Sequence, residues 1–277
     1  MYDIYMTRMH EIMVILYAGS AFAYFIDYIY NNRKAKQLAF WLLAIVWVLQ
    51  TIFLFLYMIE TGRFPVLTIF EGLYFYAWIL ITLSLLVQKF LKIEFIIFFT
   101  NILGFAVIVI HTFAPHQMAS KVMAEQLVSE LLLIHITLAI LSYGAFTLSF
   151  IFSILYLIQY DLLKRKKWGK RLLRIQDLSR LEHLAFVLNV IGVPLLLFSL
   201  ILGLQWAYIK IPNMSWFDTK ILGSFVVFVV YSIYLFVKLR KEMYGKNLAI
   251  LNVASFLIVL INFFLFGRLS EFHYWNN

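Results

Sequence analysis

The stretch from Leu131 to Ile158, LLLIHITLAILSYGAFTLSFIFSILYLI, runs for 28 residues without a charged side chain. A helix of roughly 20 apolar residues crosses the hydrocarbon of a membrane, so this stretch is long enough to span it. A helix satisfies all its backbone polar groups internally, whereas the alternating pattern of a membrane barrel strand is absent here. The stretch therefore predicts a transmembrane helix.

Seven further apolar runs fill nearly all of the remaining chain, of which 64% is hydrophobic and only 13% charged. Such a composition indicates an integral membrane protein. No Ser/Gly-rich linker divides the chain, so we expect one domain, residues 1–277, folded as an all-α bundle of eight transmembrane helices. The other seven predicted spans are Ile12–Tyr30, Leu38–Ile59, Pro65–Val87, Phe95–His111, Leu184–Tyr208, Leu222–Val237 and Leu248–Gly267.

Basic residues are distributed unevenly between the two sides of this bundle. The loops after the first, third, fifth and seventh spans carry 17 of the 23 Lys and Arg residues, and the other side carries 6. Because cytoplasmic loops hold the excess, we expect both termini to lie outside. Eight of the basic residues lie between Lys164 and Arg180 among apolar ones, which predicts a surface helix on anionic lipid. A docking site for a cytoplasmic partner is the alternative for this loop.

Several classes of function are excluded or disfavoured by composition. The chain has no cysteine, which rules out disulfides, thiolate ligands and covalent c-type haem attachment. Its net charge of +9 is concentrated in the predicted cytoplasmic loops, so it does not indicate nucleic-acid binding. A phosphate-binding Gly-rich loop, a His-Glu-x-x-His motif and a nucleophile elbow are all missing, and we expect no enzymatic activity.

Two histidines occupy positions that suggest a ligand site. His135 lies a few residues inside the fifth predicted span, and His273 follows the last span. Neutral imidazole is a good ligand for iron, and two histidines from different helices could hold a b-type haem from both faces. The alternatives are that His135 only hydrogen-bonds between helices and that His273 belongs to an interfacial aromatic belt.

The segment between the sixth and seventh spans, GLQWAYIKIPNMSWFDTK from Gly203 to Lys220, is aromatic and acidic. Together with the histidine-bearing spans on either side in sequence, Trp206, Trp216 and Asp218 suggest a haem surface. Each also has a structural interpretation, because tryptophans gather at membrane interfaces and Asp218 could cap the next helix.

Glu71 lies near the start of the third predicted span, where an isolated carboxylate is costly. We expect it to be protonated or paired, with Arg63 or a histidine as its partner. It completes the set of candidate cofactor-binding residues.

Three segments carry a family resemblance: AYFIDY from Ala23, FEGLYFYAW from Phe70 and HITLAILSYGAF from His135. They resemble HemX-type membrane proteins of the CcsA-like cytochrome c assembly superfamily, over essentially the whole chain. The resemblance implies that His135 and His273 are external axial ligands of haem. It also implies a bacterial plasma membrane location.

This sequence departs from the superfamily pattern at its Trp-rich loop. Trp206, Asp218 and Lys220 keep their places, but Ser215 and Phe217 stand where tryptophans are expected. A histidine of the following helix is replaced by Phe236.

The resemblance to HemX-type proteins implies a role in haem biosynthesis, as a negative effector of the amount of glutamyl-tRNA reductase. The alternative is a haem-handling component of cytochrome c maturation, against which the loop departures and Phe236 count. A transporter would need a continuous polar route, and only scattered asparagines within the spans offer one: Asn101, Asn189, Asn252 and Asn262.

Overall fold

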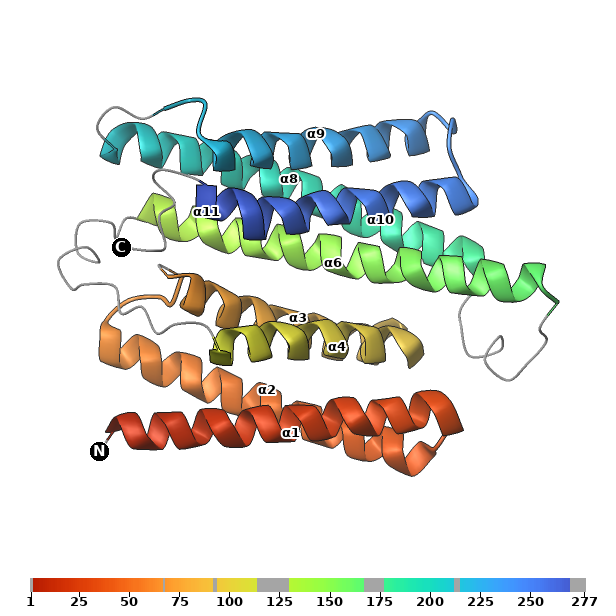
Figure 1. Ribbon diagram of the computed structural model, residues 1–277, viewed down its shortest axis with the longest axis horizontal. Helices are drawn as coiled ribbons and strands as arrows, with labels where there is room; N and C mark the ends of the chain where they lie inside the picture. The colour runs from red at the N-terminus through yellow and green to blue at the C-terminus, as the bar shows by residue number, and fades with distance from the viewer. Residues whose placement is uncertain are drawn as a thin grey trace. The chain divides into compact units, whose positions relative to one another are not determined.

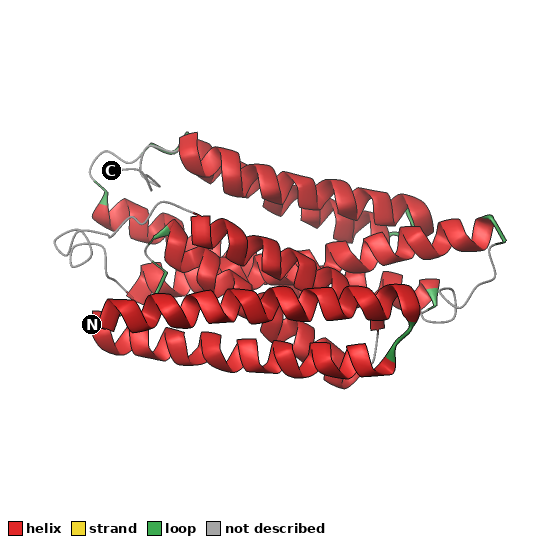
Figure 2. Ribbon diagram, turned by 60° about the horizontal axis from the view of Figure 1, so that its bottom comes forward, coloured by secondary structure: helices red, strands yellow, loops and turns green. Residues whose placement is uncertain are grey.

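The computed structural model describes residues 2–66, 68–91, 94–113, 130–166, 177–211 and 215–269, and all regular structure in these ranges is helical (Figures 1 and 2). Within these ranges, seven helices are long and apolar enough to cross a membrane, and an eighth apolar helix, Ile96–Thr112, is shorter. The prediction of an all-helical membrane bundle is confirmed. The contacts divide the chain into two compact units, Met1–Met118 and Ala119–Asn277.

Unit 1 contains four helices in its described residues: α1 (Tyr2–Tyr30), α2 (Arg33–Thr61), α3 (Ile69–Leu91) and α4 (Glu94–Phe113). The side chain of Asn32 accepts hydrogen bonds from two backbone amides and caps the start of α2. Gly62 ends α2 in the left-handed region, at φ 64°, where glycine has no steric cost.

Side-chain hydrogen bonds fix how the unit 1 helices pair. The indole of Trp47 donates to Thr82 Oγ1 at 2.8 Å, and the indole of Trp78 donates back to Thr51 Oγ1 at 2.9 Å, which joins α2 to α3. Ser20 Oγ donates to the carbonyl of Ala39 at 2.9 Å and sets the register of α1 against α2. Such bonds between apolar helices are valuable because lipid offers no competing partner.

Unit 2 contains α6 (Glu130–Lys164), α8 (Leu178–Lys210), α9 (Thr219–Leu239) and α10 (Gly245–Ile261). α10 continues through a π-helical turn, η1 (Asn262–Phe266), into α11 (Gly267–Leu269). The four long helices alternate in direction, so one end of unit 2 gathers the start of α6, the end of α8, the start of α9 and η1 (Figure 1). Most of the candidate site residues lie at this end.

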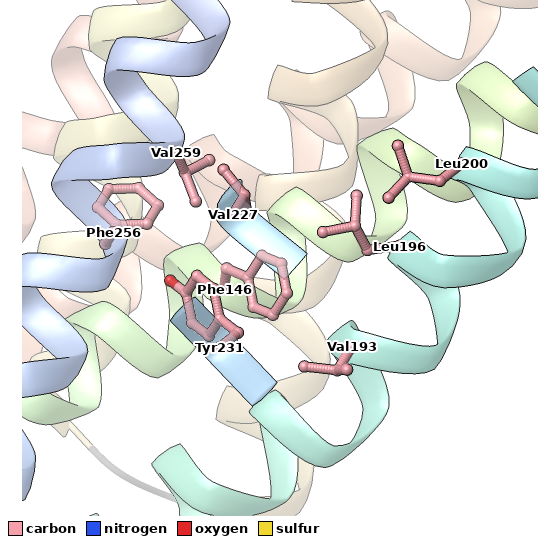
Figure 3. Packing of buried hydrophobic residues seen from close by; sticks show 8 residues of the cluster. All are labelled: Phe146, Val193, Leu196, Leu200, Val227, Tyr231, Phe256 and Val259. Atoms are coloured by element: carbon pink, nitrogen blue, oxygen red, sulfur yellow. The ribbon is translucent and has the colours of Figure 1, made fainter. Parts of the chain in front are cut away.

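The apolar core of unit 2 draws on all four of its long helices, as Figure 3 shows. At its centre the rings of Phe146 and Tyr231 stack with centroids 3.8 Å apart. Gly192 leaves room for this pair, because a β-carbon there would stand 2.5 Å from Phe146 Cε1. The cluster consists of Phe146, Val193, Leu196, Leu200, Val227, Tyr231, Phe256 and Val259.

α6 and α8 meet along a seam that repeats every seven residues. On α6, His135, Ser142 and Ser149 each make a side-chain hydrogen bond to a backbone carbonyl of α8, at 2.6, 2.9 and 2.8 Å. The accepting carbonyls, in the same order, belong to Ser199, Gly192 and Ala185, which are also seven residues apart. A seven-residue period with small residues at the contact is typical of closely packed antiparallel helices. We call this contact the α6–α8 seam.

A buried polar network joins the seam to α10. Asn252 Nδ2 donates to Ser149 Oγ at 2.8 Å and Ser153 Oγ at 2.7 Å, while its Oδ1 accepts from Asn189 Nδ2 at 2.9 Å. Two of the asparagines that the sequence offered as parts of a polar route therefore bond to each other within the packed core.

The helix boundaries differ from the predicted spans in two ways. The third span was predicted to begin at Pro65, but α3 begins at Ile69, because Thr68 caps it. α6 and α8 have 35 and 33 residues, and at 1.5 Å per residue they reach about 50 Å, beyond the hydrocarbon thickness. Most of the predicted surface helix between Lys164 and Arg180, residues 167–176, lies outside the described residues.

Candidate haem-facing site

His135 is the first member of the α6–α8 seam. Its ring lies directly against Gly203 on α8, where an added β-carbon would stand 2.5 Å from Cε1 and 2.6 Å from Nδ1. Ser199, one turn earlier on α8, contributes its carbonyl oxygen 2.6 Å from Nδ1. The Ser199 and Gly203 pair therefore forms the floor on which the imidazole rests. The sequence interpretation did not single out either residue, although their four-residue spacing places them on one helix face.

The hydrogen bonds of Ser199 fix the tautomer of His135. Ser199 Oγ donates its only proton to the carbonyl oxygen of His135 at 2.9 Å, so it can only accept from Nδ1, which lies 3.0 Å away. The carbonyl of Ser199 is likewise an acceptor. Nδ1 therefore carries the proton, and Nε2 keeps the electron pair with which a neutral imidazole binds a metal.

Trp206 lies three residues after Gly203 on α8 and is buried, with 8% of its surface exposed. Its indole N–H is also buried, and no acceptor for it exists among the described residues. A buried donor without an acceptor costs free energy, so it is the kind of group that a bound ligand can satisfy.

In the loop before α9 the tryptophan is exposed, whereas the carboxylate is buried and accepts hydrogen bonds from nearby backbone amides. Trp216 is 59% exposed and the adjacent Phe217 is 82% exposed. Asp218 is buried and accepts hydrogen bonds from the backbone amides of Lys220 and Ile221, at 2.8 and 3.4 Å. The capping role of Asp218 is confirmed.

The π-helical turn η1 closes the same end of unit 2. Lys220 Nζ donates to the carbonyl of Asn262 at 2.9 Å and lies 5.7 Å from the ring centre of Phe263. A π-helical turn withdraws carbonyls from the regular helical ladder, and a buried ammonium can compensate one of them. No sequence signal predicted the π-helical turn, so the role of Lys220 could not be anticipated.

Glu71 belongs to unit 1 and forms an ion pair there. Arg63 donates to both carboxylate oxygens, at 2.7 and 2.9 Å, and Tyr57 donates its hydroxyl to Oε1 at 2.5 Å. The predicted pairing with Arg63 is confirmed. The hydrogen bonds and the negative charge of Glu71 raise the pKa of Arg63 above its usual value.

Glu71 also completes a capping box at the start of α3. Its carboxylate accepts from the amide of Thr68 at 3.3 Å, and Thr68 Oγ1 accepts from the amide of Glu71 at 3.1 Å. The spacing Thr-x-x-Glu is the signal that could have predicted this role. The polar atoms of Glu71 are thus engaged within unit 1.

Three of the six candidate residues lie where α8 ends and α9 begins: Trp206, Trp216 and Asp218. His135, at the start of α6, joins them at this end of unit 2 (Figure 1). His273 lies outside the described residues, so the predicted second axial ligand stays a prediction. Among the described residues there is no group of three or more His, Asp or Glu side chains that could hold a metal ion alone. The donor set at His135 is instead one imidazole nitrogen, which suits one axial position of haem iron.

The apolar helices, with a histidine and an aromatic loop at one end of unit 2, are those of a multi-pass membrane protein. The chain belongs to the cytochrome C assembly protein family, whose pattern it matches over residues 66–273. It is 58% identical to Protein HemX of Bacillus subtilis (strain 168) over 276 residues, covering 100% of both chains. To Protein HemX of Brevibacillus brevis it is 42% identical over 266 residues, covering 96% of this chain and 97% of the other.

A more distant relationship links the chain to cytochrome c biogenesis proteins. It is 27% identical over 229 residues to the cytochrome c biogenesis protein CcsA of Mesostigma viride, covering 73% of each chain. The resemblance to HemX-type proteins of the CcsA-like superfamily is confirmed, and the chain is a haem-related, multi-pass membrane protein.

Proposed function

We propose that this chain binds haem at the His135 end of unit 2 and acts in haem biosynthesis as a negative effector of glutamyl-tRNA reductase abundance. It would do so without enzymatic activity of its own, from a bacterial plasma membrane. The observation that supports haem binding best is the tautomer of His135, which Ser199 holds with the electron pair on Nε2. The relatives named Protein HemX support the haem-related role.

Four candidate residues would have distinct parts in the proposed site. His135 would supply one imidazole ligand of a b-type haem, and His273, which lies outside the described residues, would supply the second. Bound haem supplies an iron centre that accepts neutral imidazole nitrogens. Trp206 would offer its buried indole N–H to a polar group of the ligand, and Trp216 would offer an exposed aromatic face.

The regulatory step is assigned to the opposite end of unit 2. There the Lys164 to Arg180 loop carries eight basic residues and joins α6 to α8, the two helices that hold His135. Anionic lipid is the first partner of such a loop. We propose that glutamyl-tRNA reductase responds to this loop directly or through an intermediary.

A second candidate function is the transfer of haem during cytochrome c maturation. The family match and the CcsA relatives favour it, as does the exposure of Trp216 and Phe217, which leaves an aromatic surface accessible to another protein. The presence of Ser215 and Phe217 in place of tryptophans counts against it.

The visible spectrum of the full-length protein, purified in detergent with haem supplied, tests the binding step. Two imidazole ligands give a low-spin reduced spectrum, which we expect in the wild type and expect to lose in His135→Ala and in His273→Ala. His183→Ala is the matched control, since His183 is exposed at the other end of unit 2. A wild type that takes up no haem would refute the proposed site.

Reductase abundance in cells tests the regulatory step separately. Cells lacking this protein should contain more glutamyl-tRNA reductase, and the wild-type chain should restore the lower amount. A chain in which the apolar residues of the Lys164 to Arg180 loop are replaced by serine, with all charges kept, should not restore it. If the reductase level were the same in all three strains, the proposed regulation would be refuted, and haem transfer would be the remaining candidate function.

A further inference from the structure

Two histidines from distant parts of the sequence meet in unit 1. The ring centres of His10 on α1 and His111 on α4 lie 5.0 Å apart, and His111 is 1% exposed. A metal about 2 Å from one nitrogen of each ring places the ring centres about 5 Å apart at a tetrahedral angle and about 6 Å apart in a linear arrangement. The observed separation matches a shared metal ion and is too short for the two axial ligands of one haem.

Thr112 sets the protonation of His10. Its hydroxyl donates to the carbonyl of Ile108 at 2.7 Å, so it accepts from Nε2 of His10, 3.0 Å away. The proton of the neutral ring is then on Nε2, and the electron pair is on Nδ1. A hydrogen bond to one ring nitrogen fixes the tautomer of a histidine and leaves the electron pair of the other nitrogen for a metal.

Met13 brings a thioether into the same layer. It lies three residues after His10 on α1, which places both side chains on one helix face, and it is 1% exposed. The hydroxyl of Tyr74 lies 3.5 Å from the sulfur of Met13, and the ring centre of Tyr74 lies 5.3 Å from that of His111. Tyr74 therefore connects the sulfur to the histidine pair.

The side-chain amide of Gln50 is a second, independent indication that this layer has an unsatisfied polar group. It is completely buried on α2, and its amide nitrogen and oxygen have no hydrogen-bond partner among the described residues. The contact between Ser20 and Ala39 fixes the antiparallel register, which brings Gln50 to the level of His10, ten residues before Ser20. Burying an amide without partners is unfavourable, so Gln50 marks this layer as one in which a polar partner is missing among the described residues.

We propose that His10, His111 and Met13 bind a single cuprous ion, Cu⁺, within unit 1. Imidazole suits several transition metals, but the thioether sulfur is a soft ligand that selects Cu⁺. Zn²⁺ sites have three or four His, Cys or carboxylate ligands, and no such group exists among the described residues. The proposal is independent of haem binding, because none of its residues belongs to the His135 site.

Metal titration of the purified full-length protein tests the proposal. The reduced protein, in detergent and without oxygen, is titrated with Cu⁺ in competition with bicinchoninate, and with Zn²⁺ separately. We expect one Cu⁺ per chain, at least 100-fold weaker binding in His10→Phe and His111→Phe, and about 10-fold weaker binding in Met13→Leu. Met58→Leu on α2 and His183→Ala in unit 2 are the matched controls and should bind as the wild type does.

X-ray absorption of the copper-loaded wild type gives a second test that requires no variant to fold. We expect nitrogen from two imidazoles and one sulfur around the copper. Copper without a sulfur neighbour, tighter binding of Zn²⁺ than of Cu⁺, or unchanged copper affinity in His111→Phe would each overturn the proposal.

Discussion

The imidazole of His135 and the α-carbon of Gly203 are in such close contact that no other residue fits at position 203 without displacing the ring. A β-carbon there would stand 2.5 Å from Cε1 and 3.1 Å from Cγ. Real β-carbons do not approach ring atoms this closely. Gly203 therefore determines where the histidine lies, although it carries no functional group.

Gly203→Ala should push His135 away from α8 and stretch its hydrogen bond to Ser199. We expect a loss of about 1–3 kcal/mol in unfolding free energy from overpacking, together with weakened haem uptake. Thermal unfolding and the visible spectrum of the haem-loaded protein measure the two effects. Gly267→Ala is the control, since nothing lies within 4 Å of the added carbon, and it should be neutral. Equal behaviour of the two variants would contradict the packing role of Gly203.

Removing one partner of the Arg63 and Glu71 pair should be costlier than removing both. Arg63→Ala leaves a buried carboxylate without its cation, which costs about 3 kcal/mol or more. The double variant Arg63→Ala with Glu71→Gln removes the charge and keeps the capping box, so it should recover part of that loss. A double-mutant cycle of thermal unfolding checks this. Simple additivity of the two single losses would disprove the coupling.

Substitutions of Asp218 should separate a capping role from a ligand role. Asp218→Asn keeps the oxygen that caps α9 and should change stability little, whereas Asp218→Ala should cost about 1 kcal/mol. If the carboxylate only caps the helix, haem uptake by Asp218→Asn equals that of the wild type. A specific loss of haem in Asp218→Asn, at unchanged stability, would show that the negative charge acts on the ligand.

The helices could be predicted from the sequence because their signal is the apolar run itself, and all eight predicted spans correspond to helices. The pairing of Glu71 with Arg63 was also predictable, since a buried carboxylate must find a cation and Arg63 is near in sequence. In both cases few other structures are possible, because a long apolar run must be buried in lipid and a buried carboxylate must be paired.

The floor beneath His135 was not predictable, because it depends on which helix packs against α6 and in what register. The seven-residue spacing of His135, Ser142 and Ser149 is visible in the sequence, but their α8 partners are backbone carbonyls, which leave no trace in residue type. The π-helical turn that begins at Asn262 could not be predicted either, because it is a feature of backbone hydrogen bonding. Contacts of backbone with side chain emerge only from the packed structure.

The α6–α8 seam gives His135 an unusual mechanical setting. The hydrogen bond of its ring is one of three similar bonds from α6 to α8, which are spread over fourteen residues, or about 21 Å of helix. A sideways pull on the imidazole is therefore resisted by Ser142 and Ser149, and a rotation of α6 large enough to release the ring would break all three bonds together. The position of the imidazole is therefore tied to the packing of α6 against α8 along the whole seam, and not to a single local contact.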